Sequence, residues 1–214
     1  GADRVHSFDT PFLLLRNSGI SFEQRVMKRA MDVIISGCML LVASPFMLLT
    51  AIAIKMEDHG PALFKQERVT LNGRKFYIYK FRSMIVDAEK NGAQFSSKND
   101  SRITKVGKFI RATRLDELPQ LLNILKGDMS LVGPRPERPQ FVEKFKEEIP
   151  RYMIKHQVRP GLTGWAQVNG YRGDTSIQKR IEYDLYYIEN WTMGFDFKII
   201  FLTFFKGFVN KNAY

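Results

Sequence analysis

The sequence predicts an α+β fold that is mainly helical and associated with a membrane. Residues 33–54 form a run of 22 residues without a charge, long enough to enter a bilayer. Apolar and aromatic residues flank Asn72-Gly73, a strong signal for a β-hairpin. Amphipathic helical patterns follow in the second half of the chain. We therefore expect a re-entrant membrane helix hairpin, a small β-hairpin and interfacial amphipathic helices.

Charge and cysteine usage restrict the class of protein. The 214 residues carry a formal net charge of +11, which indicates an anionic partner such as nucleic acid, an anionic membrane or a phosphorylated substrate. A nucleic-acid-binding protein would leave the uncharged run without a role, so we expect no nucleic acid. The single Cys38 and three scattered histidines form neither a disulfide framework nor a Cys/His zinc site. Chemistry on the cytosolic side of a membrane follows.

The pattern divides the chain into four parts. Residues 1–24 start with Gly1 instead of methionine, and we interpret them as a processing or expression scar followed by the remnant of a longer chain. Residues 25–56 form the membrane element. Residues 57–194 form a cytosolic domain with the candidate catalytic residues, and residues 195–214 form an interfacial C-terminal helix, although such a tail can also dock on its own core.

The membrane element carries Ser44-Pro45 at its midpoint. Proline removes one backbone hydrogen bond and a serine hydroxyl can bond back to the preceding turn, so the pair predicts a kink. Each half is then about 16 Å long, roughly half the hydrocarbon thickness. Basic residues lie at both ends, which favours both ends on the cytoplasmic face. A re-entrant hairpin fits, while a single-pass helix with a tolerated proline and a buried core helix remain alternatives.

The N-terminal end of this membrane element contains Lys28-Arg29-x-x-Asp32. This spacing places Asp32 one helical turn from both cations, as a carboxylate at a membrane boundary requires. An interfacial basic anchor explains the same residues. We assign membrane or lipid contacts to Lys28, Arg29, Asp32, Ser44 and Pro45.

The cytosolic part begins with the hairpin at residues 62–81 and a polar loop at residues 87–100. A short basic helix at residues 103–112 would deliver Arg111 to the residues that follow. Later helical patterns cover residues 139–148, 150–157, 176–191 and 195–211, and a glycine-punctuated loop or short strand covers residues 159–170.

Asp116-Glu117 is the most informative pair of residues. Adjacent residues on a helix point about 100° apart, so the two carboxylates suit separate roles instead of sharing a proton. One can attack a phosphorus while the other holds a divalent metal. We expect Asp116 to be the N-cap of a helix with Pro119 in its first turn, whose free N–H groups meet a phosphate, and with an apolar stripe of Leu118, Leu121, Leu122 and Leu125. Ordinary helix capping is the alternative.

Arg135 lies between Pro134 and Pro136. The prolines restrict the flanking backbone, so the guanidinium is presented at little entropic cost. The loop suits a phosphate clamp, or it is a rigid turn with a solvated arginine.

Taken together, these patterns resemble the monotopic phosphoglycosyl transferases, the bacterial sugar transferase family that initiates envelope glycan assembly. The resemblance covers the chain from Phe22 onward, and its C-terminal end is similar to the long members, whose N-terminal membrane domain would be missing here. It rests on Lys28-Arg29-x-x-Asp32, Ser44-Pro45, Tyr79-Lys80-Phe81-Arg82-Ser83-Met84, Leu115-Asp116-Glu117-Leu118, Gly133-Pro134-Arg135-Pro136 and Pro160-Gly161-Leu162-Thr163-Gly164-Trp165-Ala166-Gln167-Val168-Asn169-Gly170.

The resemblance implies transfer of a hexose 1-phosphate from a UDP-sugar to undecaprenyl phosphate, with release of UMP, at the start of exopolysaccharide, capsule or O-antigen assembly. Asp116 would be the nucleophile that forms a covalent phosphosugar intermediate, and Glu117 and Asp116 would hold Mg²⁺. The enzyme would lie on the cytoplasmic face of the bacterial inner membrane among anionic lipids, with a homodimer left open. The implied substrate-binding residues are Arg111, Arg135, Pro134, Pro136, Lys80 and Arg82.

Two alternatives remain at this point. The lipid phosphate could attack directly in a ternary complex, with Asp116 only a metal ligand, or the chain could be a non-catalytic, membrane-anchored basic scaffold. Glucose and galactose share the phosphate chemistry, so the sequence selects neither the sugar nor the glycan pathway.

Overall fold

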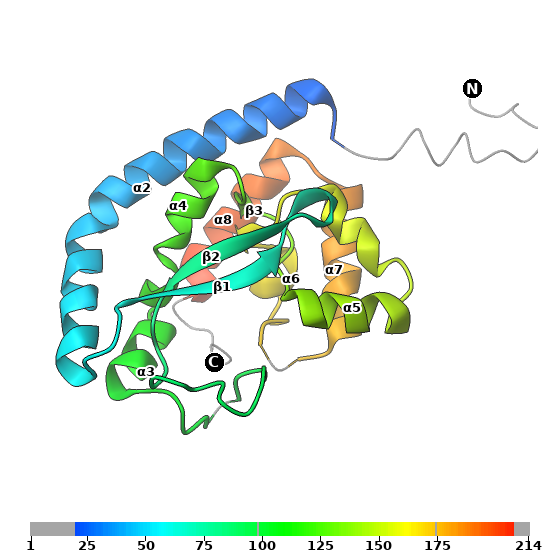
Figure 1. The fold of residues 1–214 in the computed structure, drawn as a ribbon. Coiled ribbons are helices and arrows are strands. Elements are labelled where there is room, and N and C mark those ends of the chain that lie inside the picture. Colours follow the sequence, from blue (N-terminus) through cyan, green and yellow to red (C-terminus); the bar gives the residue numbers. More distant parts are fainter. Residues whose placement is uncertain (1–19, 98, 174, 208–214) are drawn as a thin grey trace, which may run out of the picture.

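A computed structural model describes residues 20–97, 99–173 and 175–207 (Figure 1). It confirms a mainly helical α+β fold with two small sheets. The long helix α2 lies along one side of a domain built from the remaining elements. In order, they are α2 Phe22–Glu57, β1 Leu63–Val69, η1 Leu71–Gly73, β2 Lys75–Phe81, α3 Lys105–Ala112, η2 Leu115–Glu117, α4 Gln120–Lys126, β3 Ser130–Val132, α5 Pro139–Glu148, η3 Tyr152–Gln157, β4 Gly161–Thr163, α6 Trp165–Val168, α7 Ile177–Glu189 and α8 Met193–Gly207.

Helix α2 is one continuous helix of 36 residues with Pro45 inside it, and the structure does not by itself show the expected re-entrant hairpin. A capping box begins it, because Ser21 and Gln24 each bond the other's backbone N–H. Pro45 offers no N–H to the Leu41 carbonyl, but the Ser44 hydroxyl donates to that oxygen over 2.9 Å. The helix therefore continues through the proline, and Figure 1 shows that it bends along its length.

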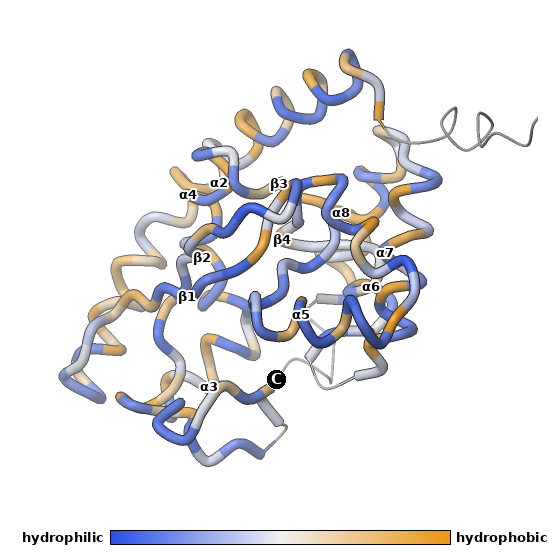
Figure 2. The backbone as a smooth tube through the Cα atoms, turned by 45° about the vertical axis from the view of Figure 1, so that its right-hand side comes forward, coloured by the Kyte–Doolittle hydropathy of each residue, from blue (hydrophilic) through white to orange (hydrophobic). Residues whose placement is uncertain are grey.

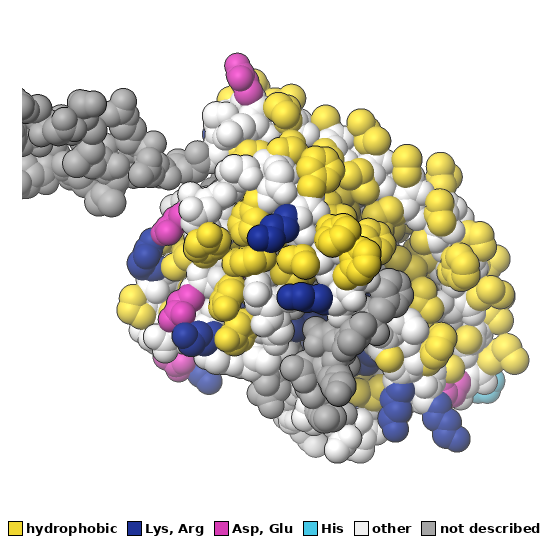
Figure 3. Space-filling model, turned by 180° about the vertical axis from the view of Figure 1, so that it is seen from behind, with side chains coloured by type: hydrophobic (Ala, Val, Ile, Leu, Met, Phe, Trp, Pro, Cys, Tyr) yellow, Lys and Arg dark blue, Asp and Glu magenta, His cyan; other side chains and the backbone are white. Residues whose placement is uncertain are grey.

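The surface of α2 is largely apolar and open. Among the described residues, it is the one helix long and apolar enough to cross a bilayer, and only 11% of its most apolar window is buried. Hydrophobic residues dominate the helix beyond its more polar N-terminal turns (Figure 2). Seen from behind, hydrophobic side chains extend over α2 and α8 with a few basic residues among them (Figure 3). A soluble core helix is therefore excluded as the explanation of the uncharged run.

One buried cation attaches the N-terminal half of α2 to the domain. Lys28 Nζ lies 2.5 Å from Asp196 Oδ2 and also bonds the Val132 carbonyl and the Tyr187 hydroxyl, each at 3.0 Å. Tyr187 and Trp191 donate to the other oxygen of Asp196. This contact joins α2, β3, α7 and α8 in one place.

The expected ion pair of Lys28 and Arg29 with Asp32 is not among the contacts of the described residues, because each of these side chains has other partners in the domain. Asp32 accepts instead from the Ser130 hydroxyl at 2.6 Å and from the Leu131 N–H at 3.2 Å. Arg29 donates to the Ile124 and Leu125 carbonyls at the end of α4, a favourable place for a cation. In the structure these three residues therefore fasten α2 to α4 and β3.

The β-hairpin is confirmed. Strands β1 and β2 are antiparallel, with Leu63 opposite Phe81 and Val69 opposite Lys75. Asn72 and Gly73 have φ of 58° and 77°, the left-handed values that a tight hairpin turn requires. The amide of Asn123 on α4 bonds both the Tyr79 N–H and the Tyr77 carbonyl, so α4 is anchored to the edge of β2.

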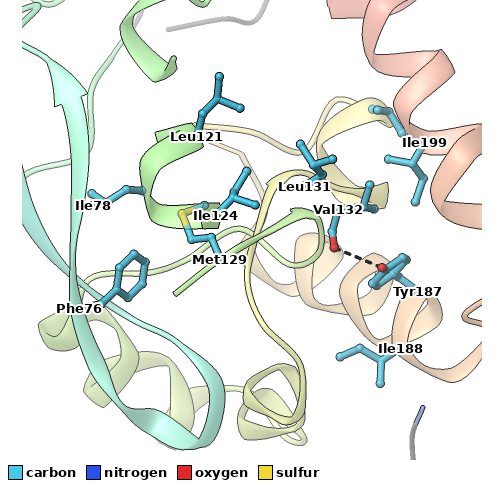
Figure 4. Close-up of a cluster of buried hydrophobic side chains, with 11 residues drawn as sticks. Phe76, Ile78, Leu121, Ile124, Met129, Leu131, Val132, Tyr187, Ile188 and Ile199 are labelled. Atoms are coloured by element: carbon cyan, nitrogen blue, oxygen red, sulfur yellow. Dashed lines mark hydrogen bonds between the residues drawn. The ribbon is translucent and has the colours of Figure 1, made fainter. Parts of the chain in front are cut away.

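The main core lies between β2, α4, β3, α7 and α8 (Figure 4). Strand β3, which pairs in parallel with β4, was not expected in a segment that reads as a loop. The backbones approach so closely that a Cβ added at Gly161 would lie 2.0 Å from the Gly133 nitrogen. The region 159–170 contains the short strand as expected and also the short helix α6, which was not expected.

The later helices agree with the sequence with one exception. Residues 139–148 are helical as expected, whereas the segment at 150–157 is a 3₁₀ helix that begins only after Arg151, whose φ is 65°. Helix α8 docks through Ile199, which is fully buried, while Phe201 and Phe205 are exposed on its other side. The remainder of the expected tail lies outside the described residues.

We expect Lys28→Met to destabilise the protein by about 3–5 kcal/mol, because it leaves Asp196 buried without its cation. Thermal or denaturant unfolding of the protein in detergent would measure this loss. Lys55→Met is the matched control, since Lys55 is exposed near the other end of the same helix. Equal stability of the two variants would contradict a structural role for the Lys28 contact.

Candidate active site

A cavity of ≈ 650 Å³ opens between the β-hairpin, the loop that follows β2, the α3–η2 turn and the start of α5. Asp116 and Glu117 lie in its wall together with several arginines from segments far apart in the sequence. Of the predicted substrate-binding residues, Lys80, Arg82, Arg111 and Arg135 also line it. Pro134 and Pro136 are buried beside it and do not.

The Asp116-Glu117 pair lies in the 3₁₀ turn η2, so the expectation that Asp116 caps a helix is wrong. Pro119 has no N–H to donate to the Leu115 carbonyl, and the Leu118 N–H takes that place at 3.2 Å. Helix α4 starts only at Gln120. Its early N–H groups at Leu121 and Leu122 already donate to backbone carbonyls, so the expected free helix N-terminus does not face the cavity.

The apolar stripe of α4 also differs from the expectation. Leu121 and Ile124 are fully buried, whereas Leu122 is 40% exposed and Leu125 is half-buried. The buried face of α4 therefore consists of Gln120, Leu121, Asn123 and Ile124. Leu118 lies in the turn before α4 and is half-buried.

Three arginines surround Glu117, which is buried. Arg172 Nη2 lies 2.5 Å from Oε1, Arg114 Nη2 lies 3.2 Å from Oε2, and Arg135 Nη1 lies 3.5 Å from Oε1. Burial alone would raise the pKa of Glu117, but these guanidinium groups and Lys80 hold it well below its usual range. Glu117 is therefore ionised and gathers three guanidinium groups at one point.

Asp116 has different surroundings although it is the next residue. Its Oδ1 is buried and accepts no hydrogen bond from the described part of the chain. Burial and the neighbouring Glu117 raise the pKa of Asp116, and Lys80, Arg172 and Arg111 oppose this rise. The result is a carboxylate with an unused oxygen, near cations but not paired to them.

Helix α3 positions Arg111 at the cavity, as expected. The Thr104 hydroxyl and the carboxylate of Glu57, at the end of α2, both bond N–H groups in its first turn. A Cβ at Gly107 would lie 2.0 Å from the Ser83 carbonyl, so only glycine permits this close approach. Arg111 Nη1 then lies 3.4 Å from the Ser83 hydroxyl.

The backbone around Arg135 is held on both sides. Lys155 Nζ donates to the Arg135 carbonyl at 3.0 Å, and Arg68 Nη1 donates to the Pro136 carbonyl at 2.9 Å. The guanidinium points to Glu117 and into the cavity. The rigid presentation expected from the flanking Pro134 and Pro136 is therefore reinforced by two buried cations.

Lys80 lies beside the arginines of the cavity. Burial, together with Arg135 and Arg68, lowers the pKa of Lys80 to about 7. An anion that enters the cavity would favour the protonated form of this amine.

Arg82 lines the cavity and is also held by neighbouring groups. Its Nη1 lies 2.7 Å from Asp58 Oδ2, and its other nitrogens donate to the Asp58 and Pro61 carbonyls. It connects the end of α2 to the cavity wall. Lys28, Arg29, Asp32, Ser44 and Pro45, predicted to contact the membrane, lie on α2 and do not line the cavity.

Sequence reasoning did not find four arginines of the cavity. Arg172 makes the shortest contact with Glu117, and its Nε is buried without a partner among the described residues. Arg172 lies two positions after the motif that ends at Gly170. Gly170 and Gly173 on either side of it have positive φ, so these two glycines were the sequence signal for a special backbone conformation at this arginine. The other three are Arg68, Arg138 and Arg180.

The acidic residues of the described chain form no cluster of three or more metal ligands. A divalent ion here would need oxygen atoms from a ligand as well as from the protein, which is common for Mg²⁺. The unused Oδ1 of Asp116 fits such a role, whereas Glu117 is already neutralised by arginines.

Comparisons with known proteins agree on one family. Residues 23–210 match the family described as bacterial sugar transferase. The chain is 45% identical over 218 residues to UDP-glucose:undecaprenyl-phosphate glucose-1-phosphate transferase of Escherichia coli (strain K12), covering all of this chain and 45% of that protein. It is 52% identical over 178 residues to UDP-N-acetylgalactosamine-undecaprenyl-phosphate N-acetylgalactosaminephosphotransferase of Aeromonas hydrophila, covering 82% of this chain and 42% of that protein.

A third relative carries a different sugar in its name. Undecaprenyl-phosphate galactose phosphotransferase of Salmonella typhimurium (strain LT2) is 38% identical over 214 residues, which cover 93% of this chain and 44% of that protein. The chain thus spans less than half the length of these three relatives.

The convergence of guanidinium groups predicts binding of inorganic pyrophosphate. We expect Arg172→Gln to weaken that binding by at least about tenfold, because charge-assisted hydrogen bonds to phosphate are lost. Isothermal titration with pyrophosphate would measure it. The matched control is Arg151→Gln, an exposed arginine outside the cavity, and equal affinity of the two variants would contradict an anion site at Arg172.

Proposed function

We propose a function that proceeds from one premise, namely that the chain belongs to the bacterial sugar transferase family. The protein transfers a hexose 1-phosphate from a UDP-sugar to undecaprenyl phosphate, releases UMP and so starts the assembly of a polysaccharide. The names of the relatives supply the two substrate classes. The observation that carries the proposal is a buried Asp116 with an unused oxygen in a cavity lined by cations.

In the first step, a carboxylate oxygen of Asp116 attacks the phosphorus bonded to the sugar. A bond forms between that oxygen and phosphorus, and the bond from phosphorus to the bridging oxygen of the diphosphate breaks. UMP leaves with the bridging oxygen and its electron pair. The product on the protein is an aspartyl phosphosugar, a mixed anhydride that remains reactive.

In the second step, a phosphate oxygen of undecaprenyl phosphate attacks the same phosphorus. The bond between phosphorus and the Asp116 oxygen breaks, which regenerates the carboxylate and yields the lipid diphosphate sugar. Both steps move negative charge between the Asp116 carboxylate and a phosphate oxygen, so they require positioning and neutralisation of charge. Arg111, Arg135 and Lys80 would provide this, together with Arg172.

Mg²⁺ fits the proposed site as a partner of the substrate. Asp116 would hold the ion together with diphosphate oxygens and water, whereas Glu117, expected from the sequence as a further ligand, already contacts three arginines. When bound, the ion would reduce the charge on the diphosphate oxygens. The unused Oδ1 of Asp116 supports this assignment.

We also propose that α2 enters the cytoplasmic face of the bacterial inner membrane and returns to it. The Ser44-Pro45 unit lies at the midpoint of the uncharged run at residues 33–54, and basic residues lie on both sides of that run. The exposed aromatic residues of α8 would lie at the same interface, where anionic lipids attract the positively charged chain. This arrangement brings a cytosolic cavity to the depth of a lipid phosphate.

The mechanism predicts that Asp116→Asn folds but loses at least about 10³-fold in turnover, because the amide cannot attack phosphorus. The wild type with UDP-sugar and Mg²⁺ but no lipid should release about one equivalent of UMP per enzyme, and mass spectrometry should find the phosphosugar on the Asp116 peptide. Glu182→Gln, which removes an exposed carboxylate elsewhere, is the control. Release of UMP only when polyprenyl phosphate is present, with no adduct, would indicate direct attack by the lipid.

The topology predicts that both ends of α2 lie in the cytoplasm. Arg25→Cys and Met56→Cys, each in a Cys38→Ser background, should resist an impermeant thiol reagent in spheroplasts and react after permeabilisation. Lys179→Cys on α7 reports the cytoplasmic side for comparison, because this residue is exposed on the cytosolic domain. Labelling of one end of α2 from outside would show that the helix crosses the membrane. We expect this result for Pro45→Leu, because leucine restores a straight helix.

A further inference from the structure

One edge of the cavity, next to the end of α2, is apolar and open. Phe64, Ile85 and Val86 line the cavity, yet each of these side chains is 40–49% exposed. Pro61 completes this edge. We name these four residues the apolar rim. The uracil of a sugar nucleotide could stack on the Phe64 ring, but Pro61, Ile85 and Val86 are aliphatic and are complementary to a hydrocarbon chain.

The apolar rim is fixed beside the end of α2. Pro61 follows the last residue of that helix by four positions, and its carbonyl accepts a hydrogen bond from Arg82 Nε at 2.7 Å. Arg82 also bonds Asp58, directly after the helix. Val86 packs against Gly60 so closely that a Cβ on the glycine would lie 2.8 Å from a Val86 methyl carbon. Helix α2, which is long and apolar enough to cross a bilayer, therefore ends where the apolar rim begins.

The interior of the cavity has the opposite character. Asp116 lies among Lys80, Arg111 and Arg172, whose charges act on its carboxylate. A path from the end of α2 inward thus passes an apolar surface and then a cluster of cations. This order is complementary to an amphiphile with a hydrocarbon tail and an anionic head.

We propose that the apolar rim binds the prenyl chain of the lipid phosphate and guides its phosphate from the membrane to Asp116. The inference rests on the proposed function and assigns to one of its two substrates a place in the cavity. The lipid keeps its chain on Phe64, Ile85 and Val86 while its head group reaches the cations. The UDP-sugar does not use this edge.

The test compares the two substrates in one variant. In Ile85→Gln/Val86→Thr, which removes apolar surface from an exposed edge, the KM for undecaprenyl phosphate in vesicles should rise at least about tenfold. The KM for the UDP-sugar and the lipid-independent release of UMP should stay at the wild-type level. The control is Met153→Gln, because Met153 is an equally exposed apolar residue outside the cavity.

A second measurement uses the wild type. Undecaprenyl phosphate with a photoreactive diazirine in the isoprene units next to the phosphate should cross-link to the peptides that contain Phe64 or Ile85 and Val86. An active variant with an unchanged KM for the lipid, or cross-links only to other peptides, would contradict the binding of the prenyl chain by the apolar rim. Neither result would contradict the proposed reaction. Failure of the proposed function would differ, because the wild type itself would then transfer no sugar phosphate to the lipid, and the rim proposal would fall with it.

Discussion

The buried contact of Lys28 with Asp196 sets the position of the apolar helix on the domain. It joins four elements, and the neighbouring Arg29 holds the last carbonyls of α4. Because Asp116 and Glu117 lie just before α4, this short helix connects the candidate active site to the long apolar helix α2. Lys28 and Arg29, which the sequence predicts at the lipid surface, thus bond groups of the domain instead. Breaking a buried ion pair such as that of Lys28 is costly.

The adjacent carboxylates of Asp116 and Glu117 have pKa values shifted in opposite directions. Glu117 lies among three guanidinium groups, and they hold its pKa low. Asp116 keeps an oxygen without a donor, and burial raises its pKa. The 3₁₀ turn causes this difference, because consecutive side chains in it point in different directions. A gathered set of cations next to a less neutralised carboxylate is the arrangement that phosphoryl transfer needs.

Local chemistry could be predicted from the sequence, and long-range partners could not. Asn72-Gly73 specified its hairpin, and the Ser44 hydroxyl bonds back to the preceding turn as predicted, because in both cases the cause lies within a few residues. The start of α4 was misplaced because a proline in a first turn suits an α-helix and a 3₁₀ turn equally well. Lys28 was paired with Asp32 on its own helix, whereas its partner Asp196 is 168 residues away. Arg172 was overlooked for the same reason, since only the fold brings it to Glu117.

The Ser44 hydroxyl takes over the acceptor that Pro45 leaves without a donor. In hydrocarbon an unsatisfied carbonyl is costly, so the serine compensates locally for the proline. Substitutions at the two positions should therefore be epistatic. Losing the hydroxyl should matter while the proline is present, and much less once a residue with an N–H replaces it. In related chains, the two positions should vary together.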